Sequence, residues 1–303
     1  MLAPSPSARR EVRRGIAALV VVQFCFALFP IFAAFAFQRF APSAVAFWRI
    51  AAGSLILLAL AFAVHGRAAW IRREDLWRFV GCSWLGVALN QGLFLEGLAR
   101  STPIHSGLVM CLIPVLTYGI AVLLRRERLN RVRAVGILIA MGGSAPLFLA
   151  RAADGTATLS AHAFGNALMF ANAISYSLYL VFAKRLLERT PALVFVAWIY
   201  AFSLPSVLWF ASGVDVAPAW EGAEKAWLAI GYAVLFPTVI AYLFNGYALA
   251  RVPASTTAFF IYMQPVITAV ASRIVLGERF QPQLVLTAIC LFVGLGLVLQ
   301  RRW

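Results

Sequence analysis

The chain alternates apolar runs of about 20 residues with short polar links along its whole length. A helix of that length crosses the roughly 30 Å apolar core of a bilayer, so each run predicts one membrane-spanning helix. The predicted spans are residues 16–37, 43–64, 76–97, 104–124, 131–149, 162–183, 192–212, 226–248, 255–276 and 282–300. The pattern therefore predicts an all-α integral membrane protein with ten transmembrane helices.

An internal repeat relates the two halves of the chain. Several residues recur at one fixed offset of 151 positions, and scattered matches continue upstream at an offset of 150. A constant offset indicates a duplicated unit, so we divide the chain into repeats at residues 1–150 and 151–303, each with five predicted helices. The pairs at offset 151 are Leu98-Ala99-Arg100 with Leu249-Ala250-Arg251, Pro114 with Pro265, Glu127-Arg128 with Glu278-Arg279, and Gly143 with Gly294.

Lys and Arg are divided unequally between the two sides of the membrane. The side that holds both termini carries 19 of the 26 basic residues, and the other side carries 7. Basic links stay in the cytoplasm, so both termini are predicted to be cytoplasmic. Since each half has an odd number of spans, the second half enters the membrane inverted. Inverted repeats are typical of transporters, in which two related halves move around a site between them.

Composition supports the membrane assignment and narrows the function. The chain is 63% hydrophobic and 12% charged, which is not the composition of a soluble domain. Its net charge of +15 lies in the links rather than in a basic patch with interleaved aromatic residues, so we expect no nucleic-acid partner. The spans hold no cluster of His, Asp and Glu, and the four cysteines lack metal-ligand spacing. We therefore expect no enzyme, no metal site and no cofactor.

Polar side chains inside the predicted spans form the candidate substrate site. In the sixth span, for example, Asn172, Tyr176 and Tyr179 share one helical face. Such groups either line a water-filled cavity or bond between helices, and the whole collection favours a cavity with aromatic walls. The predicted substrate-binding residues are Gln23, Trp48, Asn90, Gln91, Tyr118, Asn172, Tyr176, Tyr242, Asn245 and Gln264.

Few charges lie within or beside the spans. Arg49 stands about seven residues into the second span, where it either snorkels outward or pairs with Glu96 as a structural charge, or meets a substrate carboxylate. Glu127 and Glu278 follow the fourth and ninth spans, where we expect them to cap the next helix. No carboxylate stands at the middle of a span, which favours facilitated transport over proton coupling.

Two prolines suggest moving parts. Pro114 and Pro265 occupy matching positions within the fourth and ninth spans. A proline inside a helix removes a backbone hydrogen bond and favours a kink. We therefore predict that Pro114 and Pro265 act as gating hinges on opposite sides of the membrane.

These features resemble the drug/metabolite transporter superfamily in its ten-span EamA form. Pro114 with Glu127, and Pro265 with Glu278, stand thirteen residues apart, and Arg49 lies in the second span. The chain looks most like aromatic amino-acid exporters of the YddG type. The resemblance implies ten helices around a central cavity and alternating-access export of aromatic and other neutral amino acids across a bacterial inner membrane. We expect a monomer. A proton-coupled multidrug or metabolite exporter is the main alternative, ahead of an intramembrane enzyme or a channel.

Overall fold

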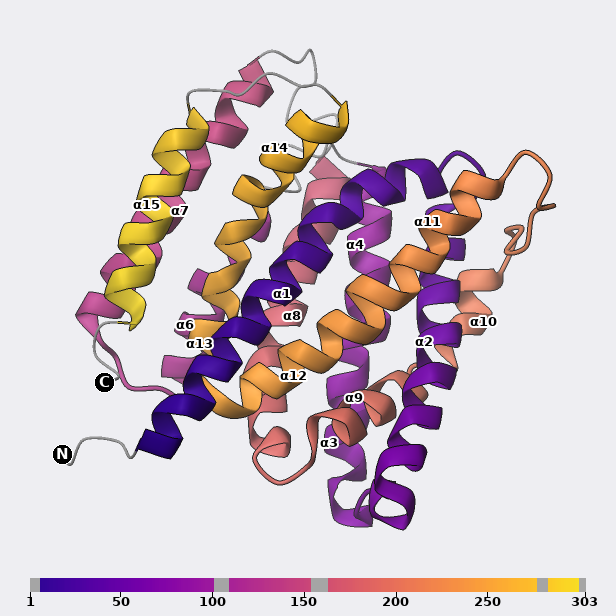
Figure 1. The fold of residues 1–303 in the computed structure, drawn as a ribbon, viewed down its shortest axis with the longest axis horizontal. Helices are drawn as coiled ribbons and strands as arrows, with labels where there is room; N and C mark the ends of the chain where they lie inside the picture. Colours follow the sequence, from indigo (N-terminus) through magenta and orange to yellow (C-terminus); the bar gives the residue numbers. More distant parts are fainter. Residues whose placement is uncertain (1–5, 101–108, 154–162, 277–282, 300–303) are drawn as a thin grey trace.

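The computed structural model describes residues 6–100, 109–153, 163–276 and 283–299, which form helices and no strand (Figure 1). Within these residues, five helical stretches are long and apolar enough to cross a membrane, and three shorter apolar helices accompany them. Many large apolar side chains, such as Leu55, Leu208, Ile274 and Phe292, lie exposed on the outside of the bundle. An apolar exterior of this kind suits lipid rather than water, so the all-helical membrane prediction is confirmed.

The first half of the chain contains α1 (Pro6–Ala36), α2 (Pro42–His65), η1 (Gly66–Ala69), η2 (Arg73–Asp75), α3 (Leu76–Ser83), η3 (Trp84–Ala88), α4 (Leu89–Ala99), α6 (Ile113–Leu123) and α7 (Arg131–Ala153). The second half contains α8 (Ala163–Leu187), α9 (Ala192–Ala201), α10 (Ser206–Ala211), α11 (Glu224–Val234), η4 (Leu235–Ile240), α12 (Ala241–Arg251), α13 (Ala254–Phe259), η5 (Phe260–Tyr262), α14 (Met263–Leu276) and α15 (Gln283–Leu299). Several predicted spans are thus interrupted rather than continuous.

Two predicted spans contain a π-helical segment at related positions, η3 between α3 and α4, and η4 between α11 and α12. In η4, Pro237 lacks the N–H that would bond to the carbonyl of Ala233. Thr238 Oγ1 donates to that carbonyl instead, at 2.8 Å. In η3, the Gly86 carbonyl accepts a hydrogen bond from Tyr242 Oη at 2.7 Å. The π segments therefore expose carbonyls that side chains satisfy.

The predicted fourth and ninth spans are interrupted directly before their prolines. α6 starts one residue before Pro114, after a turn, and α14 starts two residues before Pro265, after the 3₁₀ turn η5. Each proline lies in a first helical turn, where its missing N–H would have no partner within the helix. Tyr262 Oη donates to the Cys111 carbonyl at 2.9 Å, so the two interruptions touch. In place of the expected kinks, a new helix therefore begins next to Pro114 and next to Pro265.

Helices of the two halves pack against each other throughout the bundle (Figure 1). α1 packs against α12 and α14, and α8 packs correspondingly against α4 and α6. α2 packs against α9, and α6 against α13. α7 and α15 pair along one side of the bundle. The contacts of α1 with α12 and α14 thus correspond to those of α8 with α4 and α6 when the two halves are exchanged.

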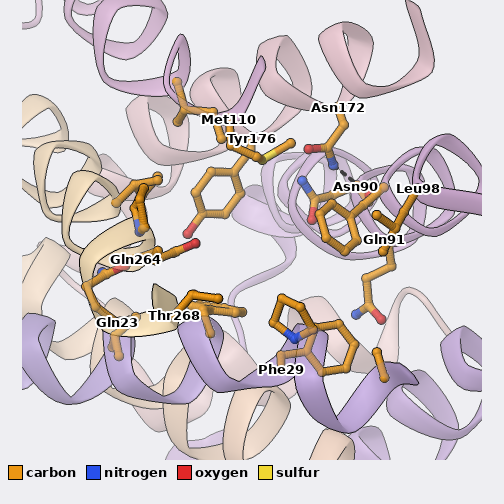
Figure 2. Close-up of a pocket in the computed structure, with 18 of the residues that line it drawn as sticks. Gln23, Phe29, Asn90, Gln91, Leu98, Met110, Asn172, Tyr176, Gln264 and Thr268 are labelled. Carbon is orange, nitrogen blue, oxygen red and sulfur yellow. Dashed lines mark hydrogen bonds between the residues drawn. The ribbon is translucent and has the colours of Figure 1, made fainter. Parts of the chain in front are cut away.

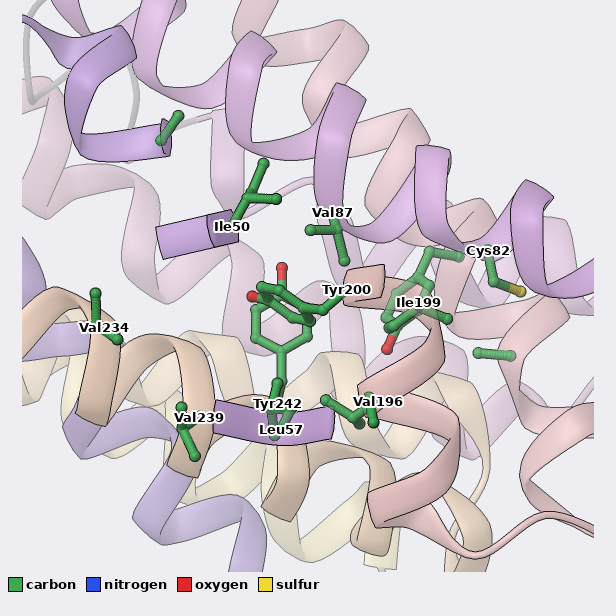
Figure 3. Packing of buried hydrophobic residues seen from close by; sticks show 14 of the residues in the cluster. Ile50, Leu57, Cys82, Val87, Val196, Ile199, Tyr200, Val234, Val239 and Tyr242 are labelled. Atoms are coloured by element: carbon green, nitrogen blue, oxygen red, sulfur yellow. The ribbon is translucent and has the colours of Figure 1, made fainter. Parts of the chain in front are cut away.

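A buried aromatic cluster joins η3, α8, α9 and α12. Tyr200 and Tyr242 meet edge to face with ring centroids 5.1 Å apart (Figure 3). Gly86 lies directly against the ring of Tyr179, and a Cβ at this position would overlap that ring. Glycine at position 86 therefore sets how closely η3 approaches α8.

Candidate functional site

A cavity of about 470 Å³ lies between helices of both halves (Figure 2). Its walls are mostly apolar, with several phenylalanine rings from α1 and α4. Amide, hydroxyl and guanidinium groups interrupt these walls at a few points. A concave, largely apolar site with few convergent polar groups is typical of small-molecule binding.

Eight of the ten predicted substrate-binding residues line this cavity. They come from five helices, α1, α4, α8, α12 and α14, because side chains at helical spacing on each one face the same centre. These residues are Gln23, Asn90, Gln91, Asn172, Tyr176, Tyr242, Asn245 and Gln264.

Two predicted residues lie outside the cavity and make packing contacts. Trp48 Nε1 donates to the Val216 carbonyl at 2.6 Å, and its ring meets Trp227 edge to face at 5.5 Å. Tyr118 Oη accepts the Asn130 N–H at 2.6 Å and donates to the carbonyl of the same residue at 3.1 Å. Trp48 thus anchors the link before α11, and Tyr118 ties α6 to the start of α7. Contrary to the prediction, neither residue lines the cavity.

Polar side chains of the cavity bond between the halves. Gln264 Nε2 donates to Gln23 Oε1 at 2.8 Å, and Asn245 Nδ2 donates to Tyr176 Oη at 3.1 Å. Gln91 lies on the opposite side of the cavity from the Gln23–Gln264 pair (Figure 2). Its Oε1 atom is buried and has no hydrogen-bond partner among the described residues. A buried acceptor without a partner is costly, so this atom is available to a ligand.

Arg49 belongs to the cavity wall and not to a structural ion pair with Glu96. Its side chain is 4% exposed, its Nε donates to Thr238 Oγ1 at 2.9 Å, and its guanidinium lies 4.9 Å from the centre of the Phe29 ring. Glu96 instead pairs with Arg100, one turn later in the chain. Among the lining residues that the structure describes, none is Asp or Glu. Arg49 is therefore a buried cation whose counter-charge is missing from the described part of the chain.

Glu127 caps a helix, but not the one that follows it. Its Oε1 accepts the Ser255 N–H at 3.0 Å, and its Oε2 accepts hydrogen bonds from Ser255 Oγ at 2.5 Å and Arg133 at 2.6 Å. Ser255 lies in the first turn of α13, so Glu127 ties the link between α6 and α7 to the other half of the chain. Glu278, the matching residue, lies outside the described residues.

The apolar part of the lining was not predicted from the sequence. Phe26, Phe29, Phe37 and Phe94 stand in apolar spans, where a cavity wall and a lipid-facing surface have the same composition. A search for aromatic residues one helical turn from the polar stripes would have found Phe94, four residues after Asn90.

The fold and the cavity define a helical membrane protein with an internal small-molecule site. The chain belongs to the EamA-like transporter family, which matches residues 13–149 and again residues 163–300. It is therefore a multi-pass membrane transporter, and the resemblance of its sequence to the EamA form of the drug/metabolite transporter superfamily is confirmed.

Individual relatives agree with this assignment. The chain is 29% identical to the uncharacterized transporter YetK of Bacillus subtilis, over 77% of this chain and 71% of that protein. It is 25% identical to a probable terminal-alkyne amino-acid exporter of Streptantibioticus cattleyicolor, over 82% of each chain. A solved crystal structure with 18% identity shares the fold at a TM-score of 0.78, over 96% of this chain and 97% of that one.

Proposed function

We propose that the protein exports aromatic and other neutral amino acids by facilitated alternating access. The cavity carries this proposal, because it combines aromatic walls for a side chain with amide, hydroxyl and guanidinium groups for a zwitterion. Its volume of about 470 Å³ falls within the range of roughly 300–1,000 Å³ usual for small-molecule sites. Similarity to a probable amino-acid exporter supports the same substrate class.

Alternating access requires two related halves, which we propose to be inverted repeats of five helices at residues 1–150 and 151–303. The double family match supports this division. So does the packing, since α1 against α12 corresponds to α8 against α4. The π-helical segments η3 and η4 occupy corresponding positions as well.

We propose that the protein is a monomer in a bacterial inner membrane, with both termini in the cytoplasm. In this orientation its cavity faces the outside of the cell. The lining residues of α1 lie in the C-terminal half of this helix, and α4 as a whole forms the C-terminal half of the third predicted span. Both parts point away from the cytoplasm in this orientation. Polar contacts close the opposite end. Glu127 binds Ser255, Arg251 binds Glu11 at 2.7 Å, and Lys184 donates to a carbonyl at the end of α12 at 2.7 Å.

Uptake of labelled phenylalanine into proteoliposomes tests the function directly. We expect saturable flux without a proton gradient, inhibited by tryptophan and methionine. Gln264→Leu, in the cavity, should reduce this flux, whereas Leu208→Ala, on the lipid-facing surface, should not. Flux that appears only with a gradient would overturn the facilitated mechanism and favour the proton-coupled exporter. Absence of amino-acid flux in both conditions would exclude this substrate class.

A further inference from the structure

We propose that Arg49 binds the carboxylate of the transported molecule, so that the cavity accepts organic acids and zwitterions and rejects organic cations. This proposal rests on the proposed transport function for its site. It goes beyond that function because it requires a carboxylate on the substrate but no α-amino group.

The local structure presents Arg49 to the cavity through Thr238. Because Pro237 has no N–H to bond to the Ala233 carbonyl, Thr238 Oγ1 donates to that carbonyl. The same hydroxyl oxygen accepts a hydrogen bond from Arg49 Nε. Gly53, one turn after Arg49 on α2, packs against the Thr238 methyl group, where a Cβ would come within 2.7 Å. The close approach of α2 to η4 therefore places the guanidinium, and its orientation is set by the π-helical segment.

The Nη groups of Arg49 remain for a ligand. Among the described residues, Thr238 Oγ1 is the acceptor for this side chain, and it accepts from Nε. A guanidinium presents five N–H donors in a planar fork that matches the two oxygens of a carboxylate. The Phe29 ring beside the guanidinium stabilises the cation but provides no acceptor for its N–H groups.

Electrostatics favour an anionic group at this position. Arg49 is almost fully buried, and neither a described lining residue nor a described ion pair supplies a negative charge. A buried cation without a counter-charge is unfavourable, and a carboxylate that enters the cavity removes this penalty. The same positive potential repels an ammonium group that enters alone.

Gln91 explains why zwitterions are also accepted. It is 1% exposed, its Nε2 donates to Tyr200 Oη at 3.3 Å, and its Oε1 has no partner in the described part of the chain. This oxygen can accept a hydrogen bond from a substrate ammonium. Since a neutral amide contributes less than a charged pair, loss of the amino group should matter less than loss of the carboxylate.

Three probes of one shape test this order: phenylalanine, 3-phenylpropanoate without the amino group, and phenethylamine without the carboxylate. Their binding to purified protein is measured by ligand-induced thermal stabilisation, and their competition by counterflow in proteoliposomes. We expect 3-phenylpropanoate to bind within about tenfold of phenylalanine, and phenethylamine to bind at least about 30-fold more weakly. Arg49→Gln should weaken both acids by about 30-fold or more, and Arg49→Lys by less. Arg100→Gln is the matched control at the exposed ion pair and should change neither.

Equal binding of phenethylamine and 3-phenylpropanoate to the wild-type protein would overturn the proposal, and this result needs no variant to fold. Unchanged selectivity in a folded Arg49→Gln protein would overturn it as well. Arg49-dependent binding of 3-phenylpropanoate without flux of any amino acid would refute the proposed amino-acid export while supporting carboxylate recognition. Amino-acid flux that is insensitive to Arg49→Gln would do the reverse.

Discussion

In the proposed orientation, Glu127 and the first turn of α13 lie at the cytoplasmic end of the protein, or inner end, and their contact should control how often this end opens. The carboxylate receives three hydrogen bonds, two from Ser255 and one from Arg133, and its side chain is 9% exposed. It joins the link after α6 to a helix of the other half, so separation of the halves at this end has to break these bonds. Glu127→Gln keeps the shape of the side chain and removes its charge.

The size of the effect follows from the lost charge. Hydrogen bonds to an ionised group contribute about 1.5–3 kcal/mol each, against about 1 kcal/mol for neutral ones. The amide of Glu127→Gln retains one acceptor oxygen, and Arg133 keeps its hydrogen bond to Ser255 Oγ at 3.3 Å, so only part of this contribution is lost. The closed state should therefore lose on the order of 2 kcal/mol, which raises the open fraction about 30-fold.

Thiol labelling measures this fraction. Ala258 lies in α13 and is fully buried, so Ala258→Cys should react only when the inner end opens. In a chain whose native cysteines are replaced by serine, Glu127→Gln should raise the labelling rate in inside-out vesicles about 30-fold. Glu127 and Glu188 both line a recess with many charged side chains, among them Arg126 and Arg185. Glu188→Gln is the matched control, because Glu188 is exposed and has no ion pair among the described residues.

Equal labelling rates in wild type, Glu127→Gln and Glu188→Gln would refute the reasoning. The Glu127 contacts would then be present without holding the inner end closed. An equal increase in both variants would show that the net charge of the recess matters, and not the bonds to Ser255.

Three further predictions concern the helices around the cavity. Pro265→Ala should slow flux severalfold while phenylalanine binding remains, because an N–H at this position favours one continuous helix across the restart; unchanged flux would exclude a hinge. Gly86→Ala should lower stability to heat or denaturant in detergent by about 1–3 kcal/mol because its Cβ overlaps a buried ring, whereas Gly81→Ala, whose Cβ meets open space, should not. Glu96→Gln should cost no more than about 0.5 kcal/mol, since its ion pair is exposed, and should leave carboxylate selectivity unchanged; loss of selectivity would show that Glu96 acts on Arg49.

Helix content and membrane character could be predicted from the sequence because both depend on one-dimensional properties. An apolar run of sufficient length forms a helix in lipid whatever its neighbours are, since the backbone has no other way to satisfy its hydrogen bonds. The repeat offset and the uneven distribution of Lys and Arg are one-dimensional as well. The polar stripe that contains Asn172 and Tyr176 also led to the cavity, because polar groups in an apolar span need a polar environment.

Tertiary structure decided which polar residues face the cavity and which partners they bind. Arg49 and Glu96 were placed at a similar depth, but depth does not specify rotation about the helix axis, and Glu96 pairs with Arg100, directly after its own helix. Trp48 and Tyr118 are the residue types expected in such a cavity, yet backbone groups occupy their polar atoms, from a distant link for Trp48 and from the next link for Tyr118.

In η4 a local contact combines with a distant one, because Thr238 donates to the Ala233 carbonyl five residues before it and accepts from Arg49 of α2. Pro237 in the sequence indicates only that one carbonyl loses its bond. The π-helical segment and the presentation of Arg49 result from the way in which Thr238 satisfies that carbonyl. Local sequence therefore determined where helices form, whereas the rotation and close approach of these helices decided the site. Both depend on residues more than a hundred positions apart in the sequence, such as Gly53 and Thr238.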